Sequence, residues 1–256
     1  MRLLAQSHIA NRYAQPTEIM AKVQVARAPG QTIVSETLSI SPDTRVDAVE
    51  LEDGRLLRGI FQGQVEVAYS AVIDLEPRIE IHAGALQHRW SDLPADILPY
   101  LMPSRFCPSD KFLRFAGREF GNVSGGAKMI AIVEWIRKHV DYLHGVSTAE
   151  TGAESTFIDR AGVCRDFTHL GLTLARAGGI PARAVAAYAL ALDPPDFHAV
   201  FEVWLGNGWW LIDPTGLAPI EGLIRIAHGR DAADIAFLTT SGPVEQVAMT
   251  VSVAKI

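Results

Sequence analysis

The strongest constraint on this chain is a cysteine followed directly by an apolar helical pattern. After Cys164, the residues Phe167, Leu170 and Leu174 recur at steps of three and four, a spacing that places them on one face of a helix. The run ends at Gly178, a residue type that commonly terminates helices. The sequence therefore predicts a buried helix with Cys164 at its N-terminus, where the helix dipole favours a thiolate over a thiol.

The composition limits the class of protein. With 256 residues, 48% of them hydrophobic, the chain is long enough for one large or two ordinary domains. A net charge of −6 without a basic block argues against a nucleic-acid partner, because phosphate binding uses clustered Lys and Arg. No run approaches the roughly 18 apolar residues of a membrane span, so no membrane partner is expected.

The cysteine content indicates a compartment. Cys107 and Cys164 are the only cysteines and lie far apart in sequence, too few for a disulfide framework, so free thiols in a reducing compartment are expected. Residues 1–8 carry too little apolar content for a secretory signal. The predicted localisation is cytoplasmic.

Residues 1–85 are predicted to form a β-rich N-terminal domain. Apolar and polar residues alternate over 18–26 and 31–40, and most clearly over 64–75. Asp53-Gly54 is a hairpin-type turn between apolar segments. Several short strands separated by Gly, Pro and Asp predict a small antiparallel β-sandwich, in which no catalytic motif is apparent.

Residues 86–256 are predicted to form an α+β domain, beginning with a connector over 86–106. Helices are expected at 111–120, 127–140, 147–157, the Cys164 segment and 219–228, and strands at 184–190, 198–205, 209–213 and 245–254. Helices first and an antiparallel sheet afterwards are typical of an α+β arrangement.

His198 and Asp213 are the candidates to act with Cys164. Thiol catalysis needs a thiolate, a base and a group that orients the base, and the three residues occur in that order. His198 opens one predicted strand and Asp213 closes the next, around a hairpin turn at Gly206-Asn207-Gly208. A turn centred on Asn207 leaves the pair about three residues out of register, roughly 10 Å, unless a bulge or wider loop closes the gap.

Each of these residues also has an ordinary structural interpretation. A cysteine at a helix start is more often a small buried hydrophobe, and a histidine before a strand is usually a surface or capping residue. Asp213-Pro214-Thr215 by itself is a strand-ending turn. Zinc binding by Cys164, His198 and Asp213 lacks a paired-ligand motif, so no metal and no cofactor are expected.

Four motifs together resemble the core of the bacterial transglutaminase-like superfamily. They are Gly-Val-Cys-Arg-Asp-Phe-Thr-His-Leu at 162–170, Gly-Gly-Ile-Pro-Ala-Arg at 178–183, Phe-His-Ala at 197–199 and Gly-Trp-Trp-Leu-Ile-Asp-Pro-Thr at 208–215. The β-rich N-terminus resembles that of two-domain members, so the likeness extends over most of the chain. It implies a papain-like core with the nucleophile at a helix N-terminus, packed on an antiparallel sheet.

Carried onto this sequence, the resemblance implies Cys164 as nucleophile, His198 as general base and acid, and Asp213 as the group that orients His198. The thiolate would attack an amide carbonyl of a peptide or protein and form a thioester, with backbone N–H groups holding the oxyanion. The second oxyanion donor is not assigned. Val200 departs from the aromatic residue expected at its position in many relatives.

Two classes of function remain open. The first is a thiol enzyme acting on amide bonds, with hydrolysis favoured over crosslinking because water is the abundant acceptor. The second is a non-catalytic peptide-binding or scaffold module that retains the fold. The filled Cys164, His198 and Asp213 positions favour the enzyme. The sequence does not indicate an oligomeric state.

Overall fold

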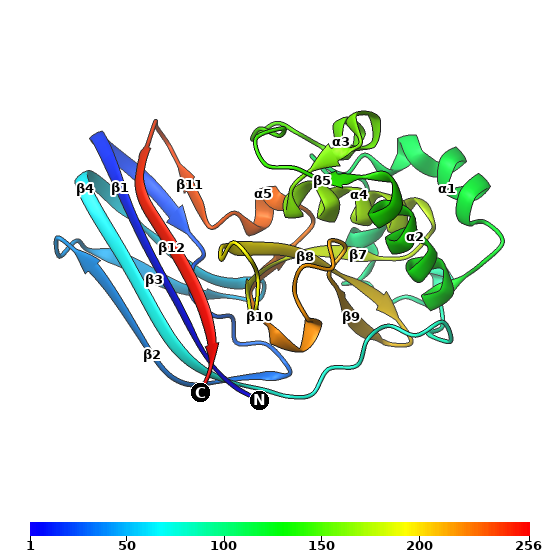
Figure 1. Cartoon of the computed structure of the whole chain (residues 1–256), viewed down its shortest axis with the longest axis horizontal. Coiled ribbons are helices and arrows are strands. Elements are labelled where there is room, and N and C mark those ends of the chain that lie inside the picture. The colour runs from blue at the N-terminus through cyan, green and yellow to red at the C-terminus, as the bar shows by residue number, and fades with distance from the viewer.

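Ten strands of this protein form one antiparallel sheet. The computed structural model describes residues 1–256, and its sheet runs in the order β11-β1-β4-β10-β7-β8-β9, with β12 beside β1 and both β2 and β3 beside β4. The helices gather over the β7–β9 end, and the N-terminal strands extend away from them (Figure 1). The structure is therefore a mixed α and β fold, mostly antiparallel in its sheet.

The elements have the following bounds. The strands are β1 (Arg2–Ala21), β2 (Gln31–Ser41), β3 (Val46–Leu51), β4 (Gly54–Leu75), β5 (Asp141–Tyr142), β6 (Ala161–Gly162), β7 (Ala182–Ala189), β8 (Phe197–Leu205), β9 (Gly208–Ile212), β10 (Leu223–Gly229), β11 (Leu238–Thr240) and β12 (Glu245–Lys255). The helices are α1 (Leu113–Phe120), α2 (Gly125–His139), α3 (Ala153–Asp159), α4 (Cys164–Ala177) and α5 (Ala232–Ile235). Short 3₁₀ turns lie at Trp90–Asp92, Leu98–Leu101, Ser109–Phe112 and Ile220–Gly222.

The long strands β1 and β4 hold the N-terminal part together. They pair along almost their whole length, with an irregularity between Tyr13 and Thr17 where the strands bend. β12 and β2 flank one half of this pair, and β11 and β3 flank the other half. Because all of them belong to one sheet, the expected separate β-sandwich is not confirmed.

The last two strands belong with the first. β12 pairs with β1 from Leu3 opposite Lys255 to Arg12 opposite Glu245, and the two ends of the chain lie side by side (Figure 1). An unpaired β1 edge would expose a row of backbone donors and acceptors, and strands from the far end of the chain cover it. Strands from residues 86–256 thus pair with a strand from residues 1–85, and the domain boundary near residue 86 stays a prediction.

Three element predictions were wrong. Residues 219–228 form a 3₁₀ turn and β10 rather than a helix. This largely apolar segment fills the place between β4 and β7, and its short pattern does not separate a buried strand from a buried helix. The predicted helix at 147–157 is reduced to α3, which begins at Ala153. The first strand begins at Arg2, well before the alternation at 18–26 that predicted it.

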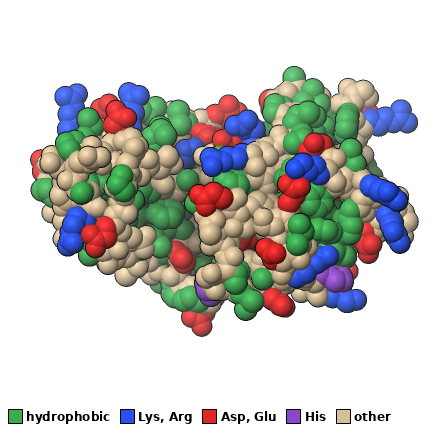
Figure 2. Space-filling model, turned by 90° about the horizontal axis from the view of Figure 1, so that it is seen from above, with side chains coloured by type: hydrophobic (Ala, Val, Ile, Leu, Met, Phe, Trp, Pro, Cys, Tyr) green, Lys and Arg blue, Asp and Glu red, His purple; other side chains and the backbone are tan.

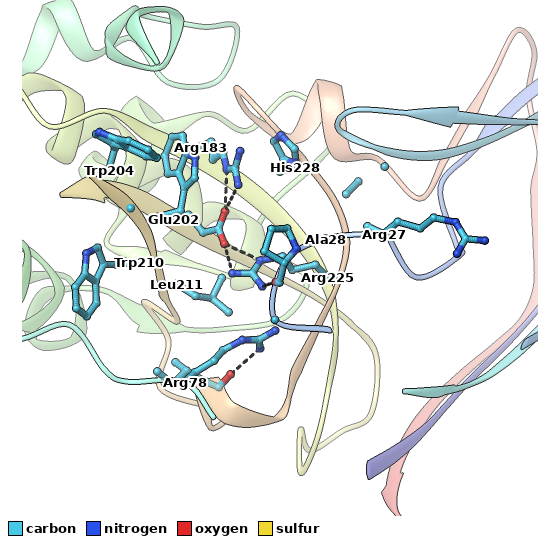
Figure 3. A pocket seen from close by; sticks show the side chains of 18 of the residues that line it. Arg27, Ala28, Arg78, Arg183, Glu202, Trp204, Trp210, Leu211, Arg225 and His228 are labelled. Carbon is cyan, nitrogen blue, oxygen red and sulfur yellow. Dashed lines mark hydrogen bonds and ion pairs between the residues drawn. The ribbon is translucent and has the colours of Figure 1, made fainter. Parts of the chain in front are cut away.

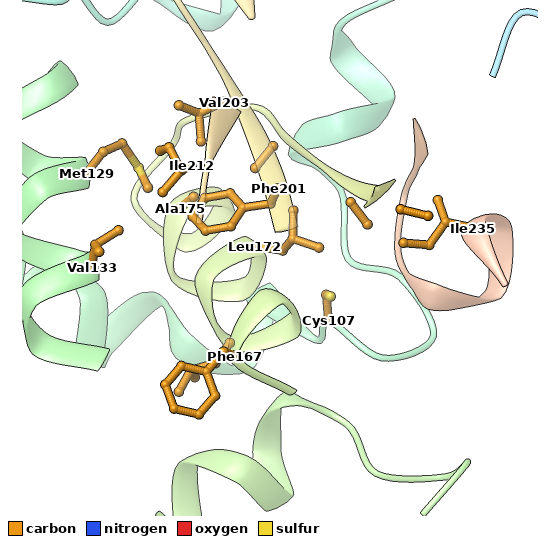
Figure 4. Packing of buried hydrophobic residues seen from close by; sticks show 14 of the residues in the cluster. Cys107, Met129, Val133, Phe167, Leu172, Ala175, Phe201, Val203, Ile212 and Ile235 are labelled. Carbon is orange, nitrogen blue, oxygen red and sulfur yellow. The ribbon is translucent and has the colours of Figure 1, made fainter. Parts of the chain in front are cut away.

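Helix α4 lies at the centre of the main core. Leu170, Leu172 and Leu174 are fully buried, and so are polar residues such as Thr168 and Thr173, so the helix is buried on nearly all sides. Phe201 and Val203 of β8 reach toward α4 from the sheet (Figure 4), and the helix presents Gly171 to the Phe201 ring. This packing holds the N-terminus of α4, and with it Cys164, at a fixed position beside the sheet.

The outer surface carries charges of both signs. In Figure 2 the basic and acidic side chains are interspersed over the face shown, without a continuous basic stripe. None of the helices combines the length and the apolar content that crossing a bilayer takes.

Candidate active site

Cys164 is the first residue of α4, and the turn before it is shaped by two neighbours. Val163 has an extended backbone, and its N–H donates to the Asp166 carboxylate over 2.8 Å. A Cβ on Gly162 would lie 2.6 Å from the Cβ of Asp166, so only glycine leaves room for that carboxylate. Asp166 thus fixes the start of the helix, and the Cys164 side chain remains partly accessible.

The hairpin of β8 and β9 brings His198 and Asp213 together. Leu205 pairs with Gly208 across a two-residue turn, so Asp213, one residue beyond β9, lies two residues from the position opposite His198. An even offset keeps both side chains on the same face of the sheet. His198 Nε2 lies 3.0 Å from Asp213 Oδ2. The predicted offset of three residues was wrong by one, and no bulge is needed.

Both oxygens of Asp213 accept hydrogen bonds from the protein. Oδ2 accepts from His198 and from the Ala218 N–H, and Oδ1 accepts from the N–H and the hydroxyl of Thr215. Arg137 holds the backbone by donating to the Asp213 carbonyl over 2.7 Å. A carboxylate occupied in this way is suited to orienting an imidazole rather than to ligating a metal.

The pair is buried and carries opposite charges. His198 is 2% exposed and Asp213 is 3% exposed. Burial by itself would lower the pKa of His198, but the hydrogen bond to Asp213 and the nearby Cys164 sulfur raise that pKa to about 9. Burial would raise the pKa of Asp213, but the His198 hydrogen bond and charge hold it below its usual value. An imidazolium next to a carboxylate is therefore the neutral-pH state.

The thiol and the imidazole are neighbours without a tightly formed hydrogen bond. His198 Nδ1, the ring nitrogen not used by Asp213, is buried and has no hydrogen-bond partner. The Cys164 sulfur is close enough to contribute to the raised pKa of His198. Catalytic hydrogen bonds are often longer in enzymes without bound substrate, and the free Nδ1 is the atom available to the thiol.

Tyr142 is a neighbour of the thiol that the sequence patterns did not single out. It lies in β5, opposite Gly162 of β6, which places its side chain beside the start of α4. Burial raises the pKa of Tyr142, and the nearby Cys164 sulfur raises it further, so the phenol is a protonated donor at neutral pH. A strand of two residues carries too little pattern to be recognised in a sequence.

The other histidine and cysteine of this region are structural. Burial raises the pKa of the Cys107 thiol to about 12, which keeps it protonated and unreactive. His169 stacks on Phe106 with ring centroids 5.0 Å apart, and its Nε2 accepts from the Ala232 N–H. Burial lowers the pKa of His169 to about 3, so it stays neutral.

The segment 192–197 before His198 borders the site. Partial burial raises the pKa of Asp196, and its carboxylate lies close enough to His144 and His198 to feel their charges. Asp196 therefore places an acidic group at the rim of the site.

Comparison with known proteins gives the family. Residues 118–214, which contain Cys164, His198 and Asp213, match the model of the transglutaminase-like superfamily. A crystal structure from Cytophaga hutchinsonii, described as a putative cysteine protease, is 37% identical with a TM-score of 0.92 and covers 99% of this chain and 90% of that chain. The chain belongs to the transglutaminase-like superfamily.

Curated mycobacterial proteins are similar over part of their length. An uncharacterized protein of Mycobacterium leprae is 28% identical over 195 residues, which are 68% of this chain and 66% of that protein. An uncharacterized protein of Mycobacterium bovis is 36% identical over 110 residues, which are 37% of this chain and 35% of that protein. The chain thus matches less than two thirds of the length of these relatives.

Proposed function

We propose that this protein is a thiol enzyme that acts on amide bonds of peptides or proteins, with Cys164 as nucleophile. The observation that carries the proposal is the buried hydrogen bond from His198 to Asp213, 3.0 Å long, beside the free Nδ1 and the cysteine at the helix start. Such a pair keeps the imidazole charged and oriented, and the imidazolium stabilises a thiolate. The similarity to the Cytophaga hutchinsonii protein described as a putative cysteine protease supports the same proposal.

In the proposed reaction the Cys164 thiolate attacks the amide carbonyl. The tetrahedral oxyanion accepts a hydrogen bond from the backbone N–H of Cys164, which has no partner within the first turn of the helix. The Tyr142 hydroxyl, a protonated donor beside that N–H, is the second donor we assign. His198 protonates the departing amine and leaves a thioester on Cys164.

Hydrolysis of the thioester is favoured over transfer to an amine. Water is the abundant acceptor, and His198, neutral after protonating the amine, would take a proton from it. Asp196 on the rim would attract a cationic acceptor, which keeps amine transfer as the competing outcome. We propose the cytoplasm as the compartment, since both cysteines are free thiols; cell fractionation tests it.

The test uses fluorescently labelled casein for cleavage and dansylcadaverine incorporation for transfer. Cys164→Ala is expected to abolish both activities, because no other group near His198 can form the thioester. Circular dichroism should show an unchanged fold. If the Cys164→Ala protein still cleaved casein, Cys164 would not be the nucleophile. The protein would then be better explained as a binding or scaffold module, with the cleavage due to a contaminating protease.

Tyr142→Phe separates the oxyanion role from packing. The variant keeps the ring and removes only the hydroxyl, so its kcat is expected to fall by about a hundredfold, the usual effect of losing one oxyanion donor. KM should change little. An unchanged kcat would show that the second donor lies elsewhere.

A further inference from the structure

A second cleft lies away from the candidate active site. Its volume is about 780 Å³, and neither Cys164, His198 nor Asp213 lines it. Its walls are the loop after β1 (26–30), the tip of the β3–β4 hairpin (51–54), the segment after β4 (77–79) and strands β7 to β10. Clefts of roughly 300–1,000 Å³ are typical of small-molecule sites, so this one is large enough for a ligand.

Two arginines in this cleft share one carboxylate. Glu202, fully buried in β8, accepts from Arg183 Nε over 2.8 Å and from Arg225 Nε over 2.7 Å (Figure 3). Burial would raise the pKa of Glu202, but the two guanidinium groups lower it, so the carboxylate is ionised. One negative charge between two positive ones leaves this cluster with a net positive charge.

Arg78 adds a cation that forms no ion pair with an acidic side chain. Its Nη1 donates to the carbonyls of Ile220 and Leu223, and its Nη2 is buried without a hydrogen-bond partner. Figure 3 shows its guanidinium group reaching into the cleft below Arg225. Burial, with Arg225 nearby, lowers the pKa of Arg78 to about 10, so it is still charged at neutral pH. A buried donor of this kind gains stability when an anion binds.

An apolar wall stands beside these cations. Trp209 and Leu211 lie on the face of β9 that lines the cleft. The Arg183 guanidinium lies 4.0 Å above the centre of the Trp209 ring, a stacked arrangement that fixes both groups. Leu211 carries further apolar surface on the side of the cleft near Arg78 (Figure 3), whereas the Trp210 ring points to the opposite face of the strand and packs on His82.

We propose that this cleft is a binding site for a carboxylate attached to an apolar or aromatic body. Arg78 holds the carboxylate with its free Nη2, and the body lies against Leu211 and Trp209. A single carboxylate matches the one cationic nitrogen that lacks a partner, Nη2 of Arg78. The source of the carboxylate is either a small organic acid or the C-terminus of a peptide.

The test compares N-acetylphenylalanine with its uncharged amide by calorimetry on the full chain in a buffer without carboxylates. The acid is expected to bind one-to-one and at least tenfold more tightly than the amide, since hydrogen bonds to charged groups are the stronger ones. Arg78→Gln should lose at least tenfold in affinity. Arg118→Gln, on the exposed surface of α1, is the matched control and should bind like the wild type.

Further measurements identify the ligand class and locate the binding site. Tighter binding of N-acetyl-Ala-Ala-Phe than of N-acetylphenylalanine would support a peptide C-terminus, and equal binding a small acid. Hydrogen exchange on the wild-type protein should show slower exchange of backbone amides at 77–79 and 208–211 with the acid only. This measurement does not depend on whether the Arg78→Gln protein folds. Binding must persist after alkylation of Cys164. Equal binding of acid and amide, no effect of Arg78→Gln in a folded protein, or loss on alkylation would overturn the proposal.

Discussion

His198 and Asp213 carry opposite charges inside the protein because each ion stabilises the charged form of the other, which burial alone would disfavour. Removal from water disfavours both ions, and the 3.0 Å hydrogen bond between them restores the charged forms. Thr215 and the Ala218 N–H hold the carboxylate from the other sides, so the imidazole has one orientation. The consequence is an imidazolium that persists up to a pH of about 9.

The first prediction concerns the reactivity of Cys164. Iodoacetamide should label the wild type at pH 6 much faster than an ordinary thiol of pKa about 8.5, because the imidazolium stabilises the thiolate. The enhancement is present below the pKa of His198 and is lost as the pH rises through about 9. His198→Ala should slow labelling at pH 6 at least tenfold.

Mass spectrometry of the labelled peptides provides the control within the same chain. Cys107, whose pKa burial raises to about 12, should stay unlabelled across this range while the protein is folded. If His198→Ala and the wild type were labelled at the same rate, the thiol and the imidazole would not act as a pair.

At the scale of elements, the contact between α4 and β8 positions the site. Gly171 lets the helix approach the sheet so closely that a Cβ there would lie 2.7 Å from Cε1 of Phe201. Phe201 lies on the strand that carries His198, so the packing of α4 on β8 fixes the distance between Cys164 and His198. Any change in this spacing moves the two groups apart.

Gly171→Ala is therefore expected to destabilise the protein by about 1–3 kcal/mol, the usual cost of overpacking a core. Urea unfolding followed by circular dichroism measures the change. Gly117→Ala is the matched control, because it lies in α1 with nothing within 4 Å of the added Cβ. There the same substitution should stabilise by about 0.5–1 kcal/mol, since glycine weakens a helix. Equal effects of the two substitutions would contradict the close-packing argument.

At the scale of the whole molecule, strands from the beginning and the end of the chain belong to one sheet. β11 and β12 pair with β1, and β10 contacts β4 through Ala227 and Gly54. The Cβ of Ala227 lies 3.1 Å from the position that a Cβ on Gly54 would take, so β4 and β10 are too closely packed here for a larger residue than glycine. The N-terminal strands are thus part of the same sheet as the site.

A fragment of residues 86–256 should not fold as a stable unit. It would lose β1, the partner of β11 and β12, and would expose those strands as unpaired edges that promote aggregation. Size-exclusion chromatography and thermal unfolding should show aggregates without a cooperative transition. Co-expression with residues 1–85 is expected to restore a folded complex. A monomeric fragment with a cooperative transition would support the predicted boundary near residue 86 instead.

Much of the second half could be predicted because its information is local. The 3.6-residue period after Cys164 gave α4, and alternation with a Gly-Asn turn gave β8 and β9, each within two residues of the observed bounds. His198 and Asp213 could be selected because they stand at the ends of these strands. Residues 223–229 were misassigned, because a short and largely apolar segment does not show a period that distinguishes a strand from a helix.

The sequence by itself determined the local elements and the residue types available for the chemistry. Only the tertiary structure decided which of them meet. A two-residue turn set the even offset that puts His198 and Asp213 on one face, and the parallel pairing of β5 with β6 brought Tyr142 to Cys164. The pairing of β12 with β1 and the cleft around Arg78 also join segments far apart in the chain. Such contacts depend on burial and strand pairing over the whole molecule, which no local pattern contains.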